Sequence, residues 1–166
     1  GTDNETRPDM TDTVAFIGLG AMGRPMVRNL ARSVPVAVYD ADPAALDAAA
    51  RFDGVAALGS PNDAAGAGVV VLMLPNSTIV ERVLGDPKDP DSLAGRLDPG
   101  TLVVDMGSSA PRVTQQLAEQ LRERGVGMVD APVSGGPRKA ATAELTIMAG
   151  GPADDYERAL PLLRAM

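Results

Sequence analysis

The stretch TVAFIGLGAMGRPM, residues 13–26, decides the fold of this chain. A short apolar run ends at Ile17, glycines occupy positions 18, 20 and 23, and a helical pattern follows at once. Glycine near the start of a helix costs roughly 0.5–1 kcal/mol relative to alanine. Three glycines within six residues therefore indicate a backbone that another group must approach closely.

The glycine spacing fits the pattern G-x-G-x-x-G, between a predicted strand at 14–17 and a predicted helix at 22–32. In that setting the first glycine allows a tight turn, the second lets the backbone approach a pyrophosphate, and the third lets the helix pack against the strand. The pyrophosphate would then face free N–H groups at the positive end of the helix dipole. The residues predicted to contact a dinucleotide here are Gly18, Leu19, Gly20, Ala21, Met22 and Gly23.

A second feature, independent of the glycines, supports a dinucleotide site. Asp40 ends the next predicted strand, twenty residues after Gly20, where a carboxylate can accept both hydroxyl groups of an adenosine ribose. A 2′-phosphate at this place would meet a like charge, and the next basic residue after Asp40 is Arg51. The sequence therefore favours NAD over NADP.

Composition narrows the classes of partner and chemistry. The chain has 166 residues, 45% of them hydrophobic, and a formal net charge of -7, which disfavours nucleic acid as a partner. Cys and His are both absent, so we expect no thiolate chemistry and no metal site. The longest apolar run, 69–75, is too short to span a membrane, and without a recognisable targeting segment we expect a cytoplasmic protein.

Strand and helix patterns alternate along the rest of the chain. Residues 1–12 are polar and without period, so we expect a disordered tail or an expression remnant, followed by a single dinucleotide-binding domain at 13–166. Alternation of nearly continuous apolar runs with helices predicts an α/β fold with a doubly wound, mainly parallel sheet. The strands are expected at 14–17, 36–39, 69–74, 102–105, 128–129 and 145–148. Helices are expected at 22–32, after Ser60-Pro61, after Ser77, from Ser109 to about Arg124, and at 154–166. In the helix that begins at Ser109, the buried stripe is predicted to be Val113, Leu117 and Leu121.

Five motifs, in order, resemble the β-hydroxyacid dehydrogenase family, which includes 3-hydroxyisobutyrate dehydrogenase and tartronate semialdehyde reductase. The motifs are FIGLGAMGRPM (16–26), MLPNSTIVERVLG (73–85), VVDMGSSAP (103–111), DAPVSGG (130–136) and LTIMAGG (145–151). The resemblance implies further cofactor contacts at Leu74, Pro75 and Asn76, with Ser108 near the nicotinamide. It also implies that Ser134, Gly135 and Gly136 hold a substrate carboxylate, as a hydroxyl group and exposed N–H groups can do.

For function, the resemblance implies hydride transfer between NAD and a small 3-hydroxy acid. It places the general acid–base lysine, and a helical second domain that supports homo-oligomers, in a segment after Met166, so this chain alone is expected to bind NAD with no catalytic residue and little turnover. Relatives commonly have glycine where this chain has Lys139 and near Ala143. The basic residues Lys139 and Lys88 are interpreted as solvated surface charges.

Two alternatives remain open from the sequence. An imine reductase shares this N-terminal architecture and similar loops but normally uses NADPH, which Asp40 disfavours. A nucleotide-binding module without chemistry, such as a sensor, also fits this chain taken alone.

Overall fold

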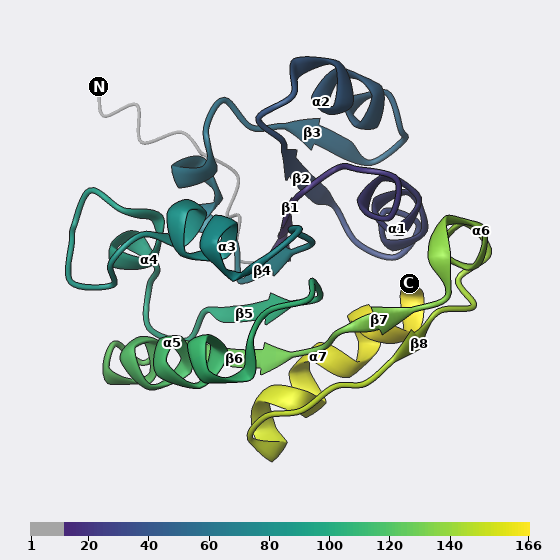
Figure 1. The fold of residues 1–166 in the computed structure, drawn as a ribbon. Coiled ribbons are helices and arrows are strands. Elements are labelled where there is room, and N and C mark those ends of the chain that lie inside the picture. The colour runs from purple at the N-terminus through teal and green to yellow at the C-terminus, as the bar shows by residue number, and fades with distance from the viewer. Residues whose placement is uncertain (1–11) are drawn as a thin grey trace, which may run out of the picture.

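A six-stranded parallel sheet forms the centre of the computed structural model, which describes residues 12–166 (Figure 1). Its strand order, β3-β2-β1-β4-β5-β6, reverses direction of winding between β1 and β4, which is the mark of a doubly wound sheet. The strands are β1 Val14–Ile17, β2 Val36–Tyr39, β3 Val55–Ala57, β4 Val69–Leu72, β5 Leu102–Asp105 and β6 Gly127–Asp130. The predicted fold class is confirmed.

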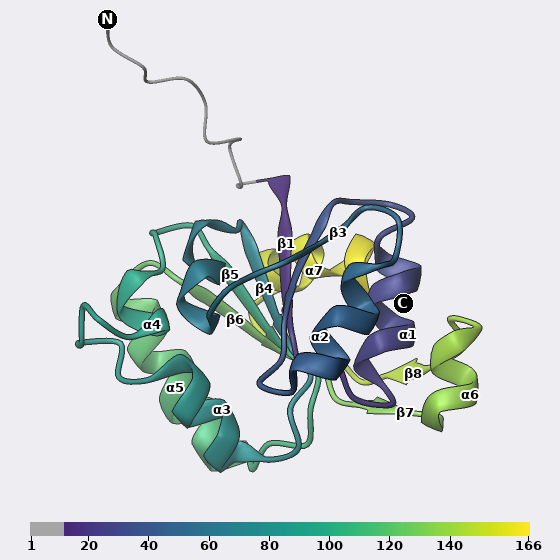
Figure 2. The ribbon, with the colours of Figure 1, turned by 90° about the horizontal axis from the view of Figure 1, so that it is seen from above.

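Helices cover both faces of this sheet, as Figure 2 shows. One face packs against α1 (Gly23–Leu30), α2 (Pro43–Ala50) and α7 (Ala153–Ala165). The other packs against α3 (Ser77–Leu84), α4 (Leu93–Arg96), α5 (Pro111–Glu123) and the short 3₁₀ helix η2 (Pro61–Gly66). Because side chains alternate along each strand, β1 sends Phe16 to the first core and Ile17 to the second. Within residues 12–166, no helix is both long and apolar enough to cross a membrane.

The last predicted strand does not join the main sheet. Residues 146–147 form β8 (Thr146–Ile147), which pairs antiparallel with β7 (Val133–Ser134) in a separate two-stranded sheet. Gly150, just beyond β8, bridges Asp130 at the end of β6 in the antiparallel sense. A short apolar run carries no information on whether its partner is parallel, so the prediction of a further parallel strand was wrong here.

Several boundaries also differ from the prediction. Strand β4 ends at Leu72 instead of 74, and β3 was missed because two of its three residues are exposed alanines at the sheet edge. The helix expected after Ser60-Pro61 is a 3₁₀ turn. Neither α2 nor α6 (Gly136–Ala141) was predicted, so Lys139 lies on a helix rather than in a loop, although it is exposed as expected.

The long helix α5 begins at Pro111, two residues after Ser109. Its N-terminal flanking residue is Ala110, and Ser109 hydrogen-bonds elsewhere. Thr114 takes the buried place expected for Val113, while Leu117 and Leu121 are buried as predicted. Apart from Asp12, the expected polar tail at 1–12 lies outside the described residues.

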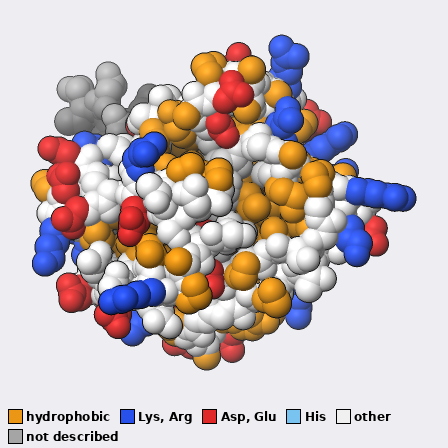
Figure 3. Space-filling view, viewed as in Figure 1, with side chains coloured by type: hydrophobic (Ala, Val, Ile, Leu, Met, Phe, Trp, Pro, Cys, Tyr) orange, Lys and Arg blue, Asp and Glu red, His pale blue; other side chains and the backbone are white. Residues whose placement is uncertain are grey.

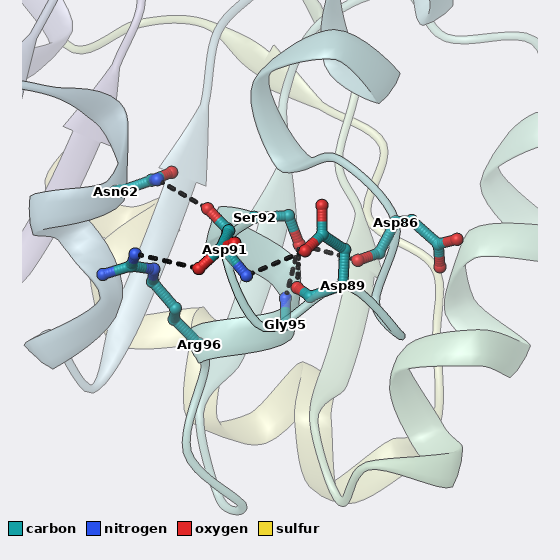
Figure 4. Close-up of polar contacts among 7 residues, drawn as sticks. All are labelled: Asn62, Asp86, Asp89, Asp91, Ser92, Gly95 and Arg96. Atoms are coloured by element: carbon teal, nitrogen blue, oxygen red, sulfur yellow. Dashed lines mark hydrogen bonds and ion pairs between the residues drawn. The ribbon is translucent and has the colours of Figure 1, made fainter.

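The acidic loop between α3 and α4 is held by local hydrogen bonds (Figure 4). The Ser92 hydroxyl donates to the backbone carbonyls of Asp86 and Asp89, at 2.6 and 2.8 Å, and accepts the Gly95 N–H at 2.9 Å. Asn62 on η2 donates to the Asp91 carbonyl at 2.9 Å. These contacts fix α4 against η2 and account for the loop without any ligand.

Candidate dinucleotide site

A hollow of about 450 Å³ lies at the carboxyl edge of the sheet, between the parallel strands β1 and β4. From this point the strands that follow β1 and those that follow β4 are added on opposite sides of the sheet. This switch point is where open α/β sheets bind ligands. Its lining comes from the β1–α1 turn, the end of β2, the end of β4 and one face of α3: Ile17, Gly18, Gly20, Ala21, Met22, Gly23, Tyr39, Asp40, Ala41, Met73, Leu74, Pro75, Ile79 and Val83. In Figure 3, the largest group of hydrophobic side chains lies to the right of the middle of the face shown, and most charged side chains lie around its edge.

The three glycines of the turn meet three different surroundings. Gly18 has φ of +109°, and a Cβ there would lie 2.1 Å from the Met73 carbonyl oxygen. A Cβ on Gly23 would lie 1.9 Å from the Gly18 carbonyl oxygen, so helix and turn touch directly. A Cβ on Gly20 would meet no atom within 4 Å. Gly18 and Gly23 thus close the turn, and Gly20 leaves its outer side bare.

That bare backbone fits a pyrophosphate. The hollow begins over Gly20 and Ala21, directly in front of the first turn of α1, where helix N–H groups and the helix dipole favour an anion. No acidic residue stands in the first turn of α1. The residues present therefore suit the phosphate part of a dinucleotide in both shape and charge.

Asp40 is held in place before any ligand is considered. Its carboxylate accepts the Leu19 N–H at 2.7 Å and the Asp42 N–H at 2.8 Å. Each carboxylate oxygen keeps a further lone pair, so ribose hydroxyl groups can still donate to it. The Leu19 side chain is fully buried and does not line the hollow; its contribution is to fix Asp40 through the backbone.

The opposite wall comes from the segment after β4. Of the three residues predicted to contact the cofactor here, Leu74 and Pro75 line the hollow and Asn76 does not. The Asn76 Oδ1 accepts the Ile79 N–H at 3.0 Å and caps α3. Sequence reasoning missed Ile79 and Val83, which line the hollow from α3. Their i, i+4 spacing on a helix that starts in the cofactor motif was the available signal.

Strand β5 ends at a buried acid, Asp105, that the prediction passed over, and the loop that follows stands beside this wall. Burial raises the pKa of Asp105, and the hydrogen bonds from Ser109 and Gly107 oppose that rise. Burial and the charge of Asp105 together raise the pKa of Asp130, its register partner on β6. Ser108 is exposed on this loop and does not line the hollow. The sequence signal for Asp105 was an acidic residue at the end of an apolar strand, as in LVVD (102–105).

The Ser134–Gly136 segment lies apart from the hollow, on β7 and at the start of α6. Gly135 and Gly136 have φ of +138° and +73°, so both need glycine, and Ser134 is exposed. A Cβ on Gly135 would lie 3.0 Å from the Lys139 side chain, so the lysine stem covers this turn.

The winding of the sheet, the bare glycine turn and the fixed acid after β2 together define a dinucleotide-binding domain of the doubly wound α/β class. Residues 13–166 match the family described as the NAD binding domain of 6-phosphogluconate dehydrogenase, and the chain belongs to this family.

The chain is also similar to individual dehydrogenases. It is 42% identical over 154 residues to the NAD-dependent L-serine dehydrogenase of Pseudomonas aeruginosa, covering 92% of this chain and 51% of that protein. It is 38% identical to the 3-hydroxyisobutyrate dehydrogenase of the same organism, covering 95% of this chain and 52% of the relative. The predicted likeness to β-hydroxyacid dehydrogenases is confirmed.

Solved structures agree. The 3-hydroxyisobutyrate dehydrogenase of Mycobacterium tuberculosis with L-serine superposes with a TM-score of 0.84 and 37% identity, over 95% of this chain and 52% of that one. An imine reductase from Myxococcus stipitatus shares the fold, with a TM-score of 0.81, at only 20% identity. This chain thus spans about half the length of the relatives it matches.

Proposed function

We propose that this chain is the NAD-binding part of a dehydrogenase that transfers hydride between NAD and a small 3-hydroxy acid. The observation that carries the proposal is the hollow at the switch point, bounded by the bare backbone of Gly20 and by the carboxylate of Asp40. NAD, when bound, accepts or donates the hydride. The chain's own residues bind and orient it: the turn after β1 takes the pyrophosphate, and Asp40 takes the adenosine ribose.

Preference for NAD over NADP follows from the charge at Asp40. Two backbone N–H groups hold its carboxylate at the ribose end, and Asp42 lies two residues further on. A 2′-phosphate would therefore meet negative charge in a fixed position. Tyr39, Ile79 and Val83 give the adenine ring an apolar wall in the same hollow.

The proposed substrate carries a carboxylate and a hydroxyl group on the third carbon, as 3-hydroxyisobutyrate and L-serine both do. We assign the carboxylate to Ser134, Gly135 and Gly136, and the region near the nicotinamide to Ser108. The exposed Ser134 hydroxyl and the open space beside Gly136 support this assignment. Side-chain selection among such acids is left to residues outside this chain.

We further propose that the general acid–base group and the oligomer contacts belong to the remaining part of a longer protein, so that this chain alone binds NAD and turns over little. Its lysines support this view, because Lys88 and Lys139 are both exposed. General acid–base catalysis typically raises a reaction rate by about 10²–10⁴-fold, so a chain without that group is expected to turn over more slowly by at least this factor. A cytoplasmic location stays a prediction.

The experiment compares this chain with the protein extended to its relatives' length. Oxidation of L-serine or 3-hydroxyisobutyrate is followed by the ultraviolet absorbance of the NADH that forms from NAD⁺. Reduction of a cyclic imine is followed in a separate assay by the loss of NADPH absorbance. The proposal expects turnover of a hydroxy acid by the extended protein only. Reduction of the imine alone would favour the imine reductase alternative, and no turnover of any substrate would favour a binding module.

A further inference from the structure

One buried carboxyl group holds the turn between β5 and α5. The Asp105 side chain, at the last position of β5, is fully buried. It accepts the Gly107 N–H on Oδ1 at 3.1 Å and the Ser109 hydroxyl on Oδ2 at 2.5 Å. Ser108, whose side chain is exposed, therefore stands between two residues that the same carboxyl group fixes.

The same turn is tied to the wall of the hollow at two further points. The Ala110 N–H donates to the Ser77 hydroxyl oxygen at 2.7 Å, and Ser77 is the first residue of α3. A Cβ on Gly107 would lie 2.3 Å from the Leu74 carbonyl oxygen, so the two backbones are in direct contact. Leu74 itself lines the hollow. The position of Ser108 relative to the hollow is thereby fixed from both sides.

Stability alone does not explain a carboxyl group at this place. Asp105 has no cationic partner among residues 12–166, where the recorded ion pair joins Arg96 and Asp91. Its neighbour across the register is a second acid, Asp130, and burial raises the pKa of both. An apolar side chain of similar size would avoid these costs. What Asp105 provides in exchange is a defined shape for the turn, through charge-assisted hydrogen bonds.

We propose that Asp105 is a positioning residue for the nicotinamide half of the site, acting through Gly107 and Ser109 to hold Ser108 against the cofactor. This inference rests on the proposed function, because it takes the dinucleotide to run from Asp40 along the hollow toward the turn after β5. The adenosine half contacts other elements, so its binding does not depend on Asp105.

The test separates the two halves of the cofactor. NADH binding is measured by the fluorescence of its nicotinamide, and binding of ADP-ribose, which has no nicotinamide, is measured by calorimetry. Ser109→Ala removes one hydrogen bond to Asp105, and Ser109→Thr keeps the hydroxyl group. Asp105→Asn keeps the shape but replaces one of the two accepting oxygens by an amide NH₂ group, which can only donate. Ser33→Ala, at an exposed serine after α1, is the matched control.

Ser109→Ala and Asp105→Asn are expected to weaken NADH binding by about fivefold or more, with ADP-ribose binding within about twofold of wild type. Ser109→Thr restores NADH binding, and Ser33→Ala changes neither ligand. Equal weakening of both ligands would show a merely structural role, and unchanged NADH binding or failure of the threonine variant would also overturn the inference. A wild-type chain that binds neither ligand would refute the proposed function itself, and the positioning role with it.

Discussion

Two turns at the same edge of the sheet are held in shape by different interactions. The turn after β1 depends on the absence of side chains at Gly18 and Gly23, because backbone oxygen atoms occupy the space that a Cβ would need there. The turn after β5 owes its form to a side chain that is present, the buried carboxyl group of Asp105. The first turn is therefore damaged mainly by adding an atom. The second shares this sensitivity at Gly107 but is also damaged by removing a hydrogen bond.

Energetics follow from this difference. Close backbone contacts cannot relax without moving a strand or a helix, so errors in the first turn spread through the sheet. A hydrogen bond to a charged group contributes about 1.5–3 kcal/mol, so the second turn can fail locally while the sheet stays folded. The predictions below test this contrast, in order of expected size.

Gly23→Ala gives the largest effect. The new Cβ would stand 1.9 Å from the Gly18 carbonyl oxygen, which must move together with β1 or α1. We expect the free energy of unfolding to fall by about 2 kcal/mol or more, as in overpacked interiors, and NADH binding to be lost. Urea denaturation followed by circular dichroism measures the first effect. An unchanged denaturation midpoint would contradict the close packing.

Gly20→Ala is the matched variant inside the same turn. Its Cβ meets no protein atom within 4 Å, so we expect the denaturation midpoint to stay close to that of wild type. The methyl group nevertheless occupies the space of the pyrophosphate, and NADH affinity should fall by about tenfold or more, about 1.4 kcal/mol. Affinity equal to wild type would show that no ligand approaches this backbone.

The acids of β5 and β6 give a smaller effect that depends on pH. Folding raises the pKa of Asp105 and Asp130 above the ordinary value of 3.8. Their stabilising contribution is therefore complete below about pH 3.8 and is lost as pH rises through the raised pKa values. Asp130→Asn should thus stabilise the fold at pH 7, by less than about 1 kcal/mol since Asp130 is partly exposed, with no gain at pH 3. Denaturation at the two pH values measures this, and a gain that is the same at both would contradict it.

Ala143→Gly has the smallest predicted effect. Ala143 has φ of +57°, a left-handed conformation that costs a non-glycine residue about 1 kcal/mol. Glycine removes this strain but has more freedom in the unfolded chain, so we expect a net stabilisation of about 0.5 kcal/mol. Thermal unfolding measures it, with Ala141→Gly on α6 as the destabilising control. Destabilisation by both variants would contradict the strain at position 143.

The contrast between the two turns also explains what could be predicted from the sequence. Gly18, Gly20 and Gly23 form a local pattern, so the turn and its neighbouring strand and helix were predicted within two residues. Asp40 was predicted because its distance from the glycines is set by one helix and one strand. The placement of these residues, at the turn after β1 and at the end of β2, did not need knowledge of distant partners.

Other features depend on contacts between distant segments, and these were missed. Asp105 contacts its own turn, but the proposed positioning role also needs the contacts of that turn with Ser77 and Leu74, which lie more than 25 residues earlier in the chain. Strand β8 pairs with β7, and Gly150 bridges Asp130, and no apolar pattern in the sequence contains either contact. Ser108 and Ser134 were named from family resemblance, and their contacts with ligands stay predictions.

The most direct test of the central claim, that the hollow between the glycine turn and Asp40 holds NAD, is a calorimetric titration of the wild-type chain and Asp40→Ala with NADH and with NADPH. We predict that wild type binds NADH more tightly than NADPH, and that Asp40→Ala weakens NADH binding by about tenfold while narrowing the difference between the two cofactors. No binding of either cofactor by wild type, or an Asp40→Ala variant that binds NADH as wild type does, would contradict the account.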